Sequence, residues 1–122
     1  MMKKVLIVED SVFIVKAIKL LLEKNGLEVL STADGNQAVN IVKEKAVDLV
    51  ILDLMMPNVS GADVFKMLKQ DEATKKTKIM ILTAKTDALR WHPELSACDK
   101  FRPKPFDNSE LVAEVKKLLG EN

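Results

Sequence analysis

The sequence has little that could staple the chain or anchor it in a membrane. Its single cysteine, Cys98, excludes an internal disulfide and cannot form a thiolate metal site alone, so we expect a small buried or half-buried side chain. The apolar runs are far shorter than the roughly 20 residues of a membrane-spanning helix, and no signal-peptide pattern precedes the first strand-like run. The formal net charge is only +1, which argues against nucleic acid as a direct partner. These absences predict a cytoplasmic globular protein without membrane insertion.

Strand-like and helix-like segments alternate along the 122 residues, which suffice for one domain with its own core. Continuous apolar runs predict buried strands, and apolar residues at helical spacing predict helices. The expected strands are 5–8, 27–31, 48–52, 79–83 and a short run before Lys104, and the expected helices are 12–24, 36–46, about 61–70 and about 108–119. The alternation predicts an α/β fold with a parallel sheet covered by helices on both faces. We therefore expect residues 1–122 to form a single domain.

One more helix is expected between residues 86 and 100, where the pattern is interrupted. The segment Trp91-His92-Pro93 is unfavourable for a helix, because proline lacks a donor and restricts the residue before it. We expect this helix to be short, late or partly irregular. His92, the only histidine, is expected in a surface loop. Trp91 could anchor a partner or cover the core, and the sequence does not choose between these interpretations.

Polar residues follow three of the expected strands. Glu9 and Asp10 come after the first, Asp53 after the third, and Thr83 ends the fourth. The carboxyl ends of parallel strands meet at one edge of a sheet, where three carboxylates would repel one another and cost folding free energy unless a cation neutralised them. This pattern predicts a divalent-metal site. Mg²⁺ prefers such hard oxygen ligands, with Asp10 and Asp53 binding it and Glu9 joining through water or holding a neighbour.

A lysine at the same edge would extend the metal site to a phosphoryl site. Lys104 would neutralise carboxylate charge and bind an anionic oxygen, while the hydroxyl of Thr83 could donate to another. Beside a metal and a lysine, a carboxylate can act as a nucleophile and form an aspartyl phosphate. Asp53 is the carboxylate best placed to attack.

Four segments resemble, in order and with suitable spacing, the receiver domains of two-component response regulators. They are Glu9-Asp10-Ser11, the run DLMMPNVSG at residues 53–61, the run ILTA at residues 81–84, and Lys104-Pro105-Phe106. The resemblance implies a CheY-like, flavodoxin-like (βα)5 fold, doubly wound, with five parallel strands in the order 2-1-3-4-5. It further implies that the Lys104–Pro105 bond is cis.

The resemblance also implies roles for individual residues. Asp53 would take a phosphoryl group from a histidine kinase or a histidine phosphotransfer protein, and Glu9, Asp10, Asp53 and the backbone carbonyl of Met55 would organise Mg²⁺. Thr83 and Lys104 would grip the phosphoryl oxygens. In the switch to the active state, Thr83 would move toward the phosphoryl group and the ring of Phe101 would turn inward.

The chain departs from the family pattern just before Lys104. Arg102 places a charge where the fifth strand is normally apolar, and Pro103 removes a backbone donor, which suits an edge strand. The departure indicates either specialised partner recognition or local drift that reshapes a loop, and the sequence leaves both open.

The predicted function is that of a stand-alone receiver that catalyses only its own phosphorylation and dephosphorylation and then controls an effector protein. A phosphorelay intermediate or a phosphate sink would use the same site and remains open. A phosphohydrolase of the haloacid-dehalogenase type needs an aspartate two residues after the nucleophile, where this chain has Met55. A flavodoxin-like FMN carrier is disfavoured because Glu9 and Asp10 would repel the cofactor's phosphate.

Overall fold

The computed structural model describes residues 2–121 and places five parallel strands in one sheet, in the order β2-β1-β3-β4-β5. The strands are β1 (Lys4–Val8), β2 (Glu28–Thr32), β3 (Leu49–Leu52), β4 (Lys78–Thr83) and β5 (Lys100–Pro103). The helices are α1 (Val12–Lys24), α2 (Ala38–Lys45), α3 (Gly61–Gln70), α4 (Ala88–Trp91) and α5 (Asn108–Leu118), with 3-10 turns at Gly35–Gln37 (η1) and Pro93–Ala97 (η2). The α/β class, the strand order and the alternation are as predicted.

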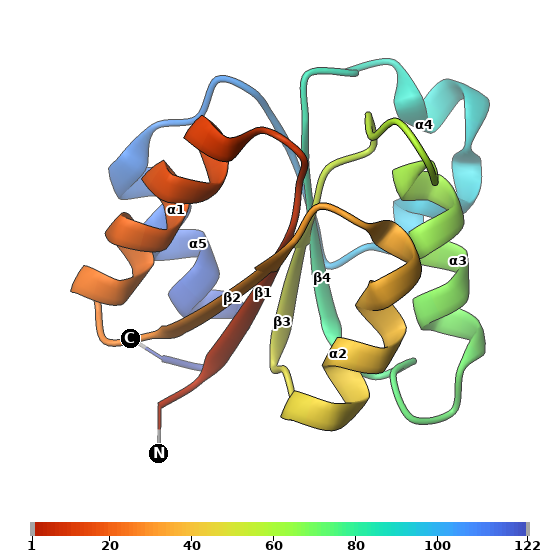
Figure 1. The fold of residues 1–122 in the computed structure, drawn as a ribbon. Coiled ribbons are helices and arrows are strands. Elements are labelled where there is room, and N and C mark those ends of the chain that lie inside the picture. The colour runs from red at the N-terminus through yellow and green to blue at the C-terminus, as the bar shows by residue number, and fades with distance from the viewer. Residues whose placement is uncertain (1, 122) are drawn as a thin grey trace.

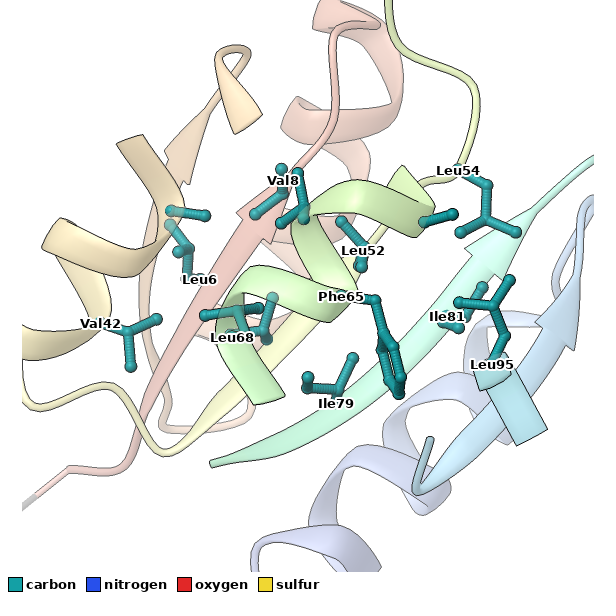
Figure 2. Close-up of a cluster of buried hydrophobic side chains, with 14 of the residues drawn as sticks. Leu6, Val8, Val42, Leu52, Leu54, Phe65, Leu68, Ile79, Ile81 and Leu95 are labelled. Atoms are coloured by element: carbon teal, nitrogen blue, oxygen red, sulfur yellow. The ribbon is translucent and has the colours of Figure 1, made fainter. Parts of the chain in front are cut away.

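Helices cover both faces of the sheet, with α1 and α5 on one side and α2, α3 and α4 on the other (Figure 1). Each face has its own apolar cluster, and Figure 2 shows the one beneath α2 and α3, where Phe65 and Leu68 lie over Ile79 and Leu52. All four residues of β3 are buried, because this central strand is covered on both sides. Packing of helices on both faces of the sheet therefore holds the carboxyl ends of the strands in fixed positions relative to one another.

Local capping explains where the helices begin. The hydroxyl of Ser11 accepts from the backbone N–H of Ile14 at 3.4 Å at the start of α1, and Ser60 and Asp107 cap α3 and α5 in the same way. The second helix begins later than the expected residue 36, because the side chain of Asp34 accepts from Asn36 and the first turn is a 3-10 turn. The second strand is shifted by one residue from its expected range.

The fourth helix is short and irregular, as expected from its proline. It consists of one α-helical turn followed by η2, and only Ala88 and Leu95 of these two elements are buried. Trp91 is 66% exposed, and its indole N–H donates to Asp87 Oδ2 at 3.3 Å. Of the two interpretations of Trp91, covering the core is therefore wrong. His92 is half-buried between the two short helices, with Nδ1 3.4 Å from Glu94 Oε2.

Cys98 is half-buried, as expected, and burial raises the pKa of its thiol. Among residues 2–121, no helix is long and apolar enough to cross a membrane.

Candidate functional site

The acidic residues predicted to form a metal site lie together at the carboxyl edge of the sheet. Carboxylate oxygens of Glu9, Asp10 and Asp53 all lie within 4.8 Å of one another. Glu9 and Asp53 are buried, whereas Asp10 is exposed at the outer side of the cluster. The neighbouring ends of β1 and β3 produce this arrangement, since the backbone N–H of Asp53 donates to the carbonyl of Val8 at 3.0 Å.

Lys104 reaches this cluster from the end of the edge strand β5. Its Nζ lies 2.6 Å from Glu9 Oε1 and 3.7 Å from Asp53 Oδ2. Its backbone N–H donates to the carbonyl of Thr83 at 2.9 Å, and the Lys104–Pro105 bond is cis. Glu9 also accepts from the backbone N–H of Ser11 at 3.1 Å. Its carboxylate therefore has two partners, Ser11 and Lys104, in addition to its place in the acidic cluster. One ammonium thus contacts two of the three carboxylates.

Thr83 and Phe101 lie on adjacent strands. Thr83 is fully buried at the end of β4, and its hydroxyl oxygen accepts from the backbone N–H of Lys85 at 3.1 Å. A hydroxyl that accepts in this way can still donate its own hydrogen to an anion. The half-buried ring of Phe101 packs against the apolar cluster that includes Phe65 and Leu95.

The loop after β3 sets the direction of Asp53. The backbone N–H of Met55 donates to Asp53 Oδ1 at 3.3 Å, and that of Gly61 donates to the carbonyl of Leu54 at 3.1 Å. A Cβ on Gly61 would overlap the backbone atoms of Asp53 and Leu54. The sequence pattern placed Gly61 at the end of the motif at residues 53–61 and at a helix start, but it did not predict this close approach. A glycine directly after the serine cap of α3 was the available signal.

The residues that pair with the charge of Arg102 were not predicted from the sequence. Its guanidinium bonds to Glu110 and Glu114 on α5. Two glutamates four residues apart on the following helix were the signal, because that spacing puts both on one helix face.

These observations define a doubly wound α/β protein with an acidic cluster and an adjacent lysine at the carboxyl edge of its sheet. The family model of the response regulator receiver domain matches residues 5–116. The chain therefore belongs to the response regulator receiver family of two-component signalling, as its motifs indicate.

Curated relatives support this assignment and extend beyond the chain. It is 37% identical over 123 residues to the DNA-binding response regulator MtrA of Mycolicibacterium paratuberculosis, an alignment covering 100% of this chain and 53% of that protein. It is 38% identical over 120 residues to the transcriptional regulatory protein CpxR of Escherichia coli, covering 97% of this chain and 50% of that protein. The chain thus spans about half the length of these relatives.

Solved structures have the same fold over nearly their whole length. The response regulator TrrA of Thermotoga maritima, solved in complex with Mg²⁺-BeF, is 34% identical with a TM-score of 0.85, over 96% of this chain and 99% of that one. The chemotaxis protein CheY4 of Vibrio cholerae is 28% identical with a TM-score of 0.87, over 97% of this chain and 99% of that one. The CheY-like fold is thereby confirmed.

Proposed function

We propose that Asp53 accepts a phosphoryl group in a Mg²⁺-dependent reaction, and that the protein is a response regulator that controls another protein. The observation that carries the proposal is the placement of the Lys104 ammonium 3.7 Å from Asp53, beside three carboxylates within 4.8 Å of one another. Acidic clusters alone are common on protein surfaces. A buried carboxylate with a lysine on one side and a candidate cation site on the other has the parts that phosphoryl transfer to an aspartate needs.

The donor atoms of the cluster suit Mg²⁺. They are all hard carboxylate oxygens, and the exposed position of Asp10 leaves room for the waters that this ion keeps. We assign Glu9, Asp10 and Asp53, with the backbone carbonyl of Met55, as the residues that would hold the ion. When bound, Mg²⁺ stabilises the negative charge on the transferring oxygens. The Mg²⁺-BeF complex of TrrA is consistent with this assignment.

The proposed reaction is an in-line transfer from a phosphohistidine. A carboxylate oxygen of Asp53 attacks phosphorus and forms a new O–P bond, while the N–P bond breaks and its electron pair stays on the donor's imidazole. The ammonium of Lys104 and the hydroxyl of Thr83 would hold phosphoryl oxygens as charge redistributes. Thr83 and Phe101 would then change position as the switch. The protein would catalyse only the phosphorylation and dephosphorylation of its own Asp53.

The donor we propose is a histidine kinase or a histidine phosphotransfer protein, acting in the cytoplasm. Residues 1–122 would form a single receiver domain, and its output would be contact with an effector protein. The names of MtrA and CpxR refer to DNA binding and transcription, but the matched part is about half of each protein. We therefore assign no direct contact with nucleic acid to the residues of this chain.

Chemical phosphorylation tests the nucleophile directly. Acetyl phosphate with Mg²⁺ should give a singly phosphorylated, base-labile protein by intact mass, and chelation of the metal should abolish the adduct. Asp53→Asn should remove it, whereas Asp63→Asn, a change at an exposed aspartate on α3, should leave it unchanged. Persistence of the adduct in Asp53→Asn would show that another residue is the acceptor.

A further inference from the structure

The edge strand β5 is joined to helix α5 by charged side chains, unlike the inner strands. On the sheet face covered by α1 and α5, strands β1, β3 and β4 present the apolar residues Val5, Ile7, Leu49, Ile51, Met80 and Leu82. Beside Met80 and Leu82, strand β5 presents Lys100 and Arg102. The apolar layer therefore stops one strand short of the sheet edge.

The two charges on β5 meet two carboxylates on α5. Arg102 Nη1 lies 2.7 Å from Glu114 Oε1, and Arg102 Nη2 bonds to Glu110 Oε2. Lys100 Nζ lies 3.7 Å from the same oxygen of Glu114. We call Lys100, Arg102, Glu110 and Glu114 the β5–α5 ion-pair cluster. The rigid fork of an arginine suits this double contact, which a lysine could not reproduce.

The central pair of the cluster is largely withdrawn from water. The side chains of Arg102 and Glu114 are 16% and 22% exposed. Arg102 Nε and Glu114 Oε2 are buried without a hydrogen-bond partner among the described residues, so the pair depends on the contacts that it does make. Removing one member would leave the other charge poorly compensated, which costs more than losing an exposed ion pair.

Helix α5 is a fixed support for this contact. Its residues Leu111 and Val115, and Leu119 directly after it, are buried in the apolar cluster under α1 and α5. Glu110 and Glu114 directly precede two of these anchors, so their positions follow from the packing of the helix. Arg102 therefore bonds to a part of the molecule that is already held in place.

Strand β5 lies at the edge of the sheet, where β4 is its one pairing partner within residues 2–121, so a contact with α5 gives it a second support. Pro103 has no backbone N–H, so the next backbone donor along the chain is Lys104, directly after the strand, whose N–H donates to the carbonyl of Thr83. The side chain of Lys104 must also reach Glu9 and Asp53. A small displacement of β5 would move that ammonium directly.

We propose that Arg102 is a positioning residue for the phosphoryl site: through Glu110 and Glu114 it fixes β5 to α5, and so holds Lys104 against Asp53. This inference rests on the proposed function for its effect on phosphorylation. The anchoring itself is a property of the unphosphorylated protein. The two parts can therefore be measured separately.

Hydrogen exchange of the Lys104 backbone amide measures the anchoring. Arg102→Met keeps a long side chain and removes the fork, and it should speed exchange at this amide roughly tenfold, as expected when local opening becomes easier by one ion-pair contact. Lys117→Met, a change at an exposed lysine on the same helix, should leave the exchange rate as in the wild type. If Arg102→Met does not fold, Arg102→Lys, which keeps the charge without the fork, takes its place, and its exchange rate at Lys104 is compared with the same wild type and control.

The phosphorylation rate measures the effect on the site. With acetyl phosphate and saturating Mg²⁺, Arg102→Met should be slowed roughly three- to tenfold, while its Mg²⁺ affinity by calorimetry stays within about twofold. The charge-exchanged variant Arg102→Glu/Glu110→Gln/Glu114→Arg, in which Glu110→Gln avoids a like-charge contact with the new carboxylate, should recover most of the rate. A merely structural defect would lower both quantities and would not be rescued by exchanging the charges.

The outcomes separate the inference from the proposed function. Unchanged amide exchange in Arg102→Met, or a parallel loss of Mg²⁺ affinity and rate without rescue, overturns the positioning role. A wild-type protein that takes no phosphoryl group on Asp53 refutes the proposed function, and the exchange measurement then still decides whether Arg102 anchors β5.

Discussion

Replacing Gly61 by alanine should damage the fold and the site together, because the helix α3 begins against the backbone that follows Asp53. A Cβ at this position would lie 2.9 Å from the carbonyl carbon of Asp53 and still closer to its oxygen and to Leu54 Cα. Gly61 does not need a left-handed conformation, since among the described glycines only Gly26 and Gly120 have positive φ. Its requirement is space, and the atoms that occupy that space are backbone.

The expected loss in the free energy of unfolding follows from the kind of atom that a Cβ on Gly61 would meet. Overpacking costs about 1–3 kcal/mol, and we take about 3 kcal/mol because backbone cannot rotate away as a side chain can. Alanine's better helix propensity recovers up to about 1 kcal/mol. The net loss is therefore about 2 kcal/mol, or a fall in Tm of roughly 8 °C for a domain of this size. The displaced Asp53 should also be phosphorylated more slowly.

Urea unfolding followed by far-UV circular dichroism measures the stability term, with Gly35→Ala as the matched control. A Cβ on Gly35 would lie 2.5 Å from Val64 Cγ2, a side-chain atom and not backbone, so this variant should lose less than Gly61→Ala, about 1 kcal/mol. Equal losses in the two variants, or a loss below about 0.5 kcal/mol for Gly61→Ala, would refute the argument from backbone contact.

Three further changes test other contacts. Asp10→Ala should weaken Mg²⁺ binding at least roughly tenfold in calorimetry. It should change stability little, because this carboxylate is exposed. An unchanged Mg²⁺ affinity would remove Asp10 from the ligand set. Lys104→Ala should reduce the change in amide spectra on phosphorylation more than it reduces Mg²⁺ affinity, so equal spectral changes in mutant and wild type would contradict the role of this lysine. The Lys43 ammonium, 2.7 Å from Asp71, and the N–H of Ala73 hold the pKa of Asp71 below its ordinary 3.8. The stability that the ionised Asp71 contributes to the folded protein is complete above its ordinary pKa and is lost as the pH falls through the lowered one. Asp71→Asn should therefore lower the urea midpoint at neutral pH but not in strong acid. A difference in midpoint between mutant and wild type that persists in acid would contradict this.

Most of the fold could be predicted because its signals are local. The fully buried β3 is a continuous apolar run, and the alternation of such runs with amphipathic helices specifies a parallel sheet. The irregular fourth helix was predictable for the same reason, since Pro93 acts on its immediate neighbours. Element ends were less well predicted, as at Asp34, where one side-chain hydrogen bond changes the first turn of a helix.

The candidate site was predictable to the extent that sequence order dictates position. Residues that follow parallel strands must meet at one edge, so the sequence alone indicated that Glu9, Asp10 and Asp53 lie near one another and that Lys104 reaches them. The roles that we assign to these residues in metal and phosphoryl binding remain predictions.

Tertiary structure decided what depends on contacts between distant segments. Only the packed molecule shows that Lys104 contacts Glu9 more closely than Asp53, that Trp91 lies outside the core, and that Arg102 bonds to α5. These features arise from the way helices and strands pack across the sheet, and no local pattern encodes such distances. The sequence by itself determined which chemical groups gather at the carboxyl edge, and packing decided how an unusual edge strand holds one of them in place.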